Sequence, residues 1–197
     1  MIPLVARLLM LAGSALFAGP ALAHAVEGMA DGFLSGFLHP LLGLDHVAAM
    51  VAVGLWGAFL GAPAIWVLPV VFPLVMAVGG AIGILGVPLP GVEIGIALSA
   101  IVLGAMVAIA ARPPLGVAAV IVGAFAIFHG HAHGTELHDA DQVLLYSLGF
   151  VLSTGLMHLA GIGIGLLVRW PQGRAMVRAA GAVISGAGVL FLMRALA

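Results

Sequence analysis

Long apolar stretches, each close to the length needed to cross a bilayer, follow one another along most of the chain. A membrane-spanning helix needs about 20 apolar residues, and short breaks rich in proline and glycine separate these stretches. The pattern predicts about six spanning helices, at residues 33–60, 64–87, 93–111, 114–130, 142–168 and 175–195. We therefore expect an all-α, polytopic helix bundle that forms a single transmembrane domain over residues 24–197.

The first 23 residues have the pattern of a secretory signal peptide. Arg7 supplies the positive charge, residues 8–18 are apolar, and residues 21–23 form a cleavage sequence of small side chains. An uncleaved first helix is the alternative. Cleavage after residue 23 would make His24 the N-terminal residue, where a free amine beside an imidazole can chelate a metal ion.

The composition limits the classes of function. The chain is 64% hydrophobic and 7% charged, whereas a soluble domain has about 25% charged residues, so we expect a membrane protein with lipid as a partner. It has no cysteine, which excludes disulfides and thiolate metal sites. It also has no lysine, which excludes ATP hydrolysis through a Walker A loop. We expect a gradient or the energy of a partner protein to drive any transport, with no ATP hydrolysis by this chain and no nucleic acid or prosthetic group involved.

Arginine positions predict the orientation. Arg169, Arg174 and Arg178 flank the connection between the last two spans, and positively charged connections lie on the cytoplasmic side. Counting spans backwards places Arg112 on the same side and residue 24 on the opposite side, where a signal peptide would leave it. We expect a multi-pass protein of a bacterial inner membrane, with its mature N-terminus and its histidine-rich loop in the periplasm.

Three ionisable side chains lie within eight residues of the first apolar stretch, namely His39, Asp45 and His46. An ionisable group at the bilayer centre costs roughly 2.5–3.5 kcal/mol on insertion scales, so such groups usually have a function. All three are good ligands for a divalent ion, which indicates that a cation or proton is handled inside the membrane. The alternative is that Asp45 and His46 form a polar pair that holds helices together.

The spacing of these residues leaves two geometries open. In a regular helix His39 and His46 would share a face about 10 Å apart, too far to bind one ion, with Met50 one turn beyond His46. Either they are successive ion positions, or the helix is broken. Pro40 and Gly43 favour an irregular or broken backbone, as found where transporters expose ion ligands at the midplane.

A second polar group follows the fourth span, with four histidines and three carboxylates in fourteen residues. His129 and His133 are four residues apart, which places both on one helical face within reach of a single ion, and Glu136 is one turn further along. We expect His131 and His138 to be loop residues that attract cations. Weak, nonspecific metal binding by a histidine-rich loop is the alternative.

Two further ionisable residues are each compatible with a structural role or with metal binding. Glu93 begins the third span, where it is either a helix cap or a ligand. His158 lies deep in the span 142–168, one turn from Thr154, as either a hydrogen-bonded buried histidine or an inner ion position. We expect the outer ends of the first, third and fourth spans to converge on Glu93 and the histidines. The imidazole and carboxylate set suits Ni²⁺, Co²⁺ or Zn²⁺ better than Mg²⁺ or Cu⁺.

Together these residues resemble the HupE/UreJ family of nickel/cobalt permeases. The resemblance covers essentially the whole chain and rests on two motifs, His39-Pro40-x-x-Gly43-x-Asp45-His46 and Phe128-His129-Gly130-x-Ala132-His133-Gly134-x-Glu136. It implies a permease that imports Ni²⁺ or Co²⁺ from periplasm to cytoplasm for the maturation of hydrogenase or urease. It also implies a metal pathway formed by His39, Asp45, His46, Glu93, His129, His133 and Glu136.

Two other functions fit the same residues. An intramembrane zinc hydrolase would hold one ion with three histidines and an aspartate and keep a position open for water. The hydrolase hypothesis does not explain why the ligands are spread through the membrane depth. A metal-binding accessory subunit without transport activity is the other alternative. Four residues are candidates for a secondary pathway, namely His24, Met50, His131 and His158.

Overall fold

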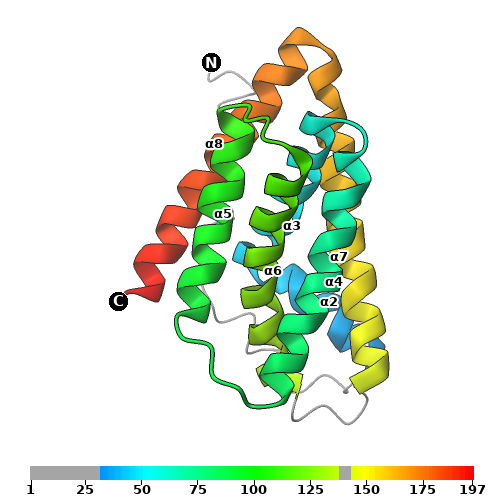
Figure 1. Ribbon diagram of the computed structural model, residues 1–197, viewed down its shortest axis with the longest axis vertical. Helices are drawn as coiled ribbons and strands as arrows, with labels where there is room; N and C mark the ends of the chain where they lie inside the picture. The colour runs from blue at the N-terminus through cyan, green and yellow to red at the C-terminus, as the bar shows by residue number, and fades with distance from the viewer. Residues whose placement is uncertain (1–31, 138–142) are drawn as a thin grey trace, which may run out of the picture.

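The computed structural model describes residues 32–137 and 143–197, and over these residues the chain is entirely helical. The predicted all-α class is therefore confirmed for the described part, while the signal peptide at residues 1–23, His24 and His138 lie outside it. The helices are α2 (Phe33–Leu42), α3 (Leu44–Leu60), α4 (Ala64–Ile84), α5 (Val92–Ala108), α6 (Leu115–Glu136), α7 (Val143–Gly165), the short 3₁₀ helix η4 (Leu166–Arg169) and α8 (Pro171–Ala195) (Figure 1).

The predicted spans correspond to these elements, with some changes at their ends. Four helices are long and apolar enough to cross a membrane, namely α4, α6, α7 with η4, and α8. The pair α2 and α3 passes the same test as one bent span, and α5 is a shorter apolar helix of 17 residues. The prediction that the fourth span ends at residue 130 is wrong, because α6 continues to Glu136. These elements make the chain a multi-pass membrane protein.

The first span is broken, as the sequence predicts. Helices α2 and α3 meet at an angle of 85°, and Gly43 between them has an extended backbone. Pro40 lies inside α2 and has no N–H to contribute to its hydrogen bonds. The new helix starts where the N–H of Val47 donates to the carbonyl of Gly43 over 2.9 Å. The break places His39 at the end of one helix and His46 at the start of the next.

Glycines bring α4 and α6 into backbone contact. A Cβ atom at Gly130 would collide with the carbonyl oxygen of Met76, and one at Gly134 with that of Gly80. Each of these glycines directly follows a histidine, so His129 and His133 lie about 100° around α6 from the contact face. The close packing on α4 therefore fixes the direction in which both histidines point.

Helix α3 is the centre of the molecule and contacts α4, α5, α7 and α8. Its side chains Val53, Leu55 and Trp56 are at most 1% exposed, and the Trp56 indole N–H donates to the carbonyl of Ala111. Arg112 precedes the start of α6, whereas Glu136 is its last residue. We call these two ends of the bundle the arginine end and the histidine end; η4, which ends at Arg169, and the start of α8 lie at the same end as the start of α6 (Figure 1).

Candidate metal centre

Asp45 fixes the orientation of the His46 ring. Its Oδ1 accepts the backbone N–H of His46 over 2.8 Å and also lies 2.8 Å from the Nδ1 of the same residue. A carboxylate oxygen only accepts hydrogen bonds, so Nδ1 is the protonated ring nitrogen and Nε2 carries the lone pair. Nε2 is buried and has no hydrogen-bond partner. A carboxylate that orients a histidine in this way is the usual support of a metal ligand.

Ser99 of α5 fixes the orientation of the His129 ring. The Ser99 hydroxyl donates to the carbonyl of Ile96 over 2.6 Å and lies 2.9 Å from the Nε2 of His129. Its one hydrogen is used by Ile96, so His129 must donate from Nε2, and its lone pair is on Nδ1. His129 is 0% exposed, and its Nδ1 has no hydrogen-bond partner.

These two histidines form what we call the buried pair, His46 and His129. Their ring centroids are 4.7 Å apart, with the rings nearly perpendicular. Each ring presents an unpaired lone pair in the protein interior. Such an atom has lost its hydrogen bond to water without a replacement, which costs free energy, and most buried polar atoms therefore have a partner. A bound cation would satisfy both atoms.

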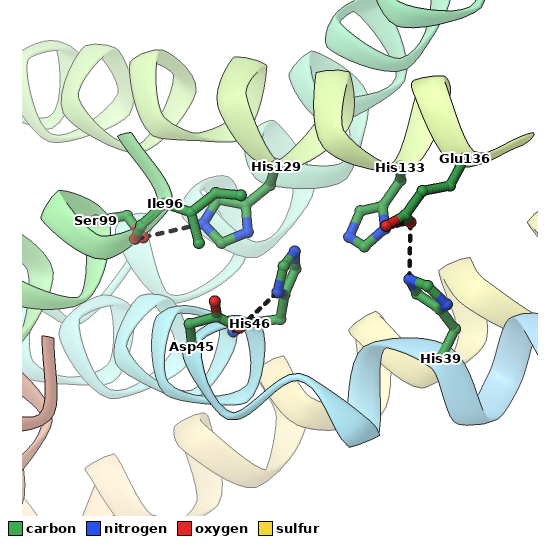
Figure 2. A network of polar contacts seen from close by, with 8 residues as sticks. All are labelled: His39, Asp45, His46, Ile96, Ser99, His129, His133 and Glu136. Atoms are coloured by element: carbon green, nitrogen blue, oxygen red, sulfur yellow. Dashed lines mark hydrogen bonds and ion pairs between the residues drawn. The ribbon is translucent and has the colours of Figure 1, made fainter. Parts of the chain in front are cut away.

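His133 extends the buried pair toward the histidine end. Its ring centroid lies 4.6 Å from that of His46 and 5.0 Å from that of His39. Figure 2 shows the His46 ring between His129 and His133. Neither ring nitrogen of His133 has a hydrogen-bond partner. Because the helix break turns His39 and His46 toward one space, both reach the same histidine.

Glu136 completes a second group of ligands. Its Oε2 is 3.0 Å from the Nε2 of His39 and 3.4 Å from the Nδ1 of His133. One ligand atom from each of the three residues lies within 4.8 Å of the others, close enough to share an ion. We call His39, His133 and Glu136 the open triad, because the side chains of His39 and Glu136 are 33% and 55% exposed.

The open triad offers a cation a polar route from the surface to the buried histidines. A cavity of about 240 Å³ also reaches His133, between α4, α6 and α7. Its walls are mainly apolar, with side chains such as Met76, Tyr146 and Phe150. An apolar surface offers a cation no ligands, so the carboxylate of Glu136 is the better place for it to arrive.

Four other candidate residues lie outside this group. Glu93 is exposed in the first turn of α5, and no described contact joins it to the histidines. Met50 is buried in the hydrophobic core. The prediction that His131 is a loop residue is wrong: it is a buried part of α6, and its Nε2 lies 2.8 Å from the Val87 carbonyl. His158 is also buried, on α7.

The structure thus unites His39, Asp45, His46, His129, His133 and Glu136, and leaves Glu93 apart from them. Sequence reasoning missed Ser99. One signal for it exists, because Ser99 is the single hydroxyl side chain of α5, in a helix that is otherwise apolar apart from Glu93. A lone hydroxyl in an apolar span usually bonds to a backbone carbonyl or to a polar group on a neighbouring helix.

Comparison with known proteins gives two matches. The chain matches the family described as HupE / UreJ protein over residues 10–191. It is also 45% identical over 175 residues to Protein HupE of Rhizobium leguminosarum bv. viciae, a match that covers 88% of this chain and 92% of that protein. No solved structure matches the chain.

Proposed function

This chain belongs to the HupE/UreJ family, and from that premise we propose that it is a permease that carries Ni²⁺ or Co²⁺ across a bacterial inner membrane. The metal is its cargo rather than a resident cofactor. Transport runs down a gradient, without ATP, and supplies metal for the maturation of an enzyme such as hydrogenase or urease. The residues of the metal pathway are His39, Asp45, His46, Glu93, His129, His133 and Glu136, as the resemblance to the family implies, and among them Asp45 acts by orienting His46.

The observation that carries this proposal is the shared position of His133. It belongs to the open triad and also contacts His46 of the buried pair. A cation held by His39 and Glu136 can therefore exchange these exposed ligands for buried ones without leaving His133. Stepwise exchange of ligands avoids releasing a bare ion into an apolar interior, which would be very costly.

The chemistry of the ligands supports a borderline divalent ion. The described centre offers four imidazoles and two carboxylates, and thiolates are absent from the whole chain. Imidazole suits Ni²⁺, Co²⁺ and Zn²⁺, whereas Mg²⁺ prefers oxygen ligands alone. Glu136 at the exposed end attracts a cation, and exposed Glu93 at the start of α5 lies at the same end of the bundle.

The positions of charge support import as the direction of transport. The arginine end has Arg112, Arg169 and Arg174, and positively charged connections usually remain in the cytoplasm. The histidine end would then face the periplasm and capture the scarce metal there. Release at the cytoplasmic side completes import.

The test is uptake of radioactive Ni²⁺ and Co²⁺ into proteoliposomes that contain the purified protein, with and without a pH gradient. We expect saturable uptake that needs no ATP and that disappears in the double variant Asp45→Asn/His46→Ala. Comparison of the two metals ranks them, and the effect of the pH gradient shows whether protons move with the metal.

The same protein distinguishes the alternatives. An absence of uptake together with one tightly retained Zn²⁺ per chain would overturn the proposal in favour of an intramembrane hydrolase. Metal binding without uptake or hydrolysis would instead indicate an accessory subunit. Circular dichroism of the double variant tests whether a loss of uptake comes from misfolding.

A further inference from the structure

A second set of unpaired polar atoms lies deeper in the bundle than the centre described above. The Nε2 of His158 and the hydroxyl oxygens of Ser153 and Thr154 are buried without a hydrogen-bond partner. All three residues belong to α7, and each is at most 2% exposed. Such atoms are uncommon in protein interiors, so their presence in one segment calls for an explanation.

The other ring nitrogen of His158 has a partner that the sequence of α4 provides. A backbone hydrogen bond links the ring to Pro69, and since proline has no N–H, the acceptor is its carbonyl. In a regular helix that carbonyl would accept the N–H four residues later, but this residue is Pro73. The Pro69 carbonyl is thus free to hold His158 through Nδ1, which leaves the lone pair on Nε2.

Thr154 lies on the same face of α7 as His158, because the two residues are four apart. A threonine in a helix usually bonds its hydroxyl to a carbonyl of the preceding turn, yet Oγ1 of Thr154 has no partner. An imidazole lone pair and a hydroxyl oxygen are therefore presented side by side on one buried helical face. An imidazole nitrogen is a good ligand for a divalent transition-metal ion, and a neutral hydroxyl oxygen beside it is a weaker one.

Phe72 connects this face to the buried pair. Its ring centroid lies 5.5 Å from that of His129 and 5.6 Å from that of His158, with both contacts tilted toward edge-on. Phe72 is 0% exposed. His158 is thus one aromatic ring away from the last histidine of the centre.

We propose that His158 and Thr154 form an additional, weaker binding position for the transported divalent cation, next to Phe72 and deeper in the bundle than the buried pair. This inference rests on the proposed function. Among the described residues no carboxylate contacts His158, so the position holds the ion less strongly than the open triad does. An ion leaves a weaker position more readily than a strong one, so this position favours release.

The experiment must separate ligation by His158 from its structural bond to α4. Pro73→Ala restores a backbone N–H at residue 73, which can bond the Pro69 carbonyl and makes the hydrogen bond from His158 dispensable. The four proteins to compare are the wild type, Pro73→Ala, His158→Ala and the double variant His158→Ala/Pro73→Ala. Each is assayed for thermal unfolding, for Ni²⁺ bound per chain at equilibrium dialysis, and for Ni²⁺ uptake in proteoliposomes.

Relative to Pro73→Ala, we expect the double variant to stay folded, to bind one Ni²⁺ fewer, and to have a maximal uptake rate lower by roughly tenfold. The half-saturating concentration should change little, because the open triad is intact. If the double variant binds as many Ni²⁺ ions per chain as Pro73→Ala and transports them equally fast, the inference is overturned and His158 has a structural role. A wild type that transports no metal would instead overturn the proposed function, whatever the ion counts.

Thr154→Val gives an independent check that keeps both His158 and its bond to α4. Valine has nearly the same shape as threonine and removes the unpaired hydroxyl, so the variant should be at least as stable as the wild type. We expect its maximal uptake rate to fall several-fold. An unchanged rate would contradict the role of Thr154.

Discussion

Asp45 and Ser99 influence the centre through the histidine rings that they hold. Asp45 accepts from Nδ1 of His46 and Ser99 accepts from Nε2 of His129, so the two rings expose opposite nitrogens, Nε2 and Nδ1 respectively. Without these partners each ring could rotate or exchange its proton between nitrogens. The polar partners therefore decide which atoms meet the metal.

For Asp45 we expect Asp45→Asn to weaken Ni²⁺ binding by about 10- to 100-fold, because the amide no longer supports the charge of a metal-bound imidazole. Isothermal titration of the purified protein measures the effect. Asp45→Glu keeps the charge but moves it by one methylene group. Full affinity in that variant would show that charge alone matters and not the position of Oδ1.

For Ser99 we expect Ser99→Ala to lower the free energy of unfolding by about 1–3 kcal/mol, since it leaves the buried Nε2–H of His129 unpaired. It should also weaken Ni²⁺ binding. Ser185→Ala is a matched control, because the Ser185 hydroxyl likewise donates to a backbone carbonyl, that of Ile101, but away from the histidines. Equal losses of metal affinity in both variants would contradict a specific role for Ser99.

At the scale of the helices, two features of backbone geometry build the centre. The bend between α2 and α3 turns His39 and His46 toward His133. The backbone contact between α4 and α6 then sets the rotation of α6. Each feature depends on residues that are not ligands themselves, so substitutions there should affect the metal site indirectly.

Gly130→Ala tests the contact between α4 and α6. The new methyl group would collide with the Met76 carbonyl, so we expect a loss of about 1–3 kcal/mol in the free energy of unfolding and weaker Ni²⁺ binding. Gly116→Ala in the same helix is the control, because nothing lies within 4 Å of a Cβ there. Thermal unfolding in detergent compares the two. Similar stability of both variants would refute the packing argument.

At the scale of the whole molecule, the two ends of the bundle have different chemistry. The histidine end has Glu136 and Glu93, whereas Arg112, Arg169 and Arg174 lie at the arginine end; Arg194, in the last turn of α8, departs from this pattern. This asymmetry supports the proposed orientation, in which the ligands face the periplasm and the arginines remain in the cytoplasm.

The orientation can be tested directly because the natural chain has no cysteine. Pro90→Cys and Gln172→Cys place single thiols at exposed positions on opposite ends. In intact spheroplasts we expect an impermeant maleimide to label residue 90, and residue 172 only after the membrane is opened. The reverse pattern would contradict import through the histidine end.

The sequence by itself determined the features that depend on local composition and spacing. Apolar length predicted the helices, Pro40 and Gly43 predicted the break, and the four-residue spacing placed His129 and His133 on one face. These features follow from helix geometry and from the cost of burying polar groups, which act between residues close in the chain. The predicted end at residue 130 was wrong because glycine packing against α4 continues the helix through a polar segment.

The tertiary structure decided which of these residues meet. Sequence spacing left His39 and His46 as either successive positions or neighbours, and only the 85° bend and the position of α6 bring both to His133. The support of His129 by Ser99, the bond of His131 to Val87 and the bond of His158 to Pro69 likewise join different segments. Such contacts depend on the angles and rotations of packed helices, which close packing across the whole bundle sets and which no local pattern in the chain contains.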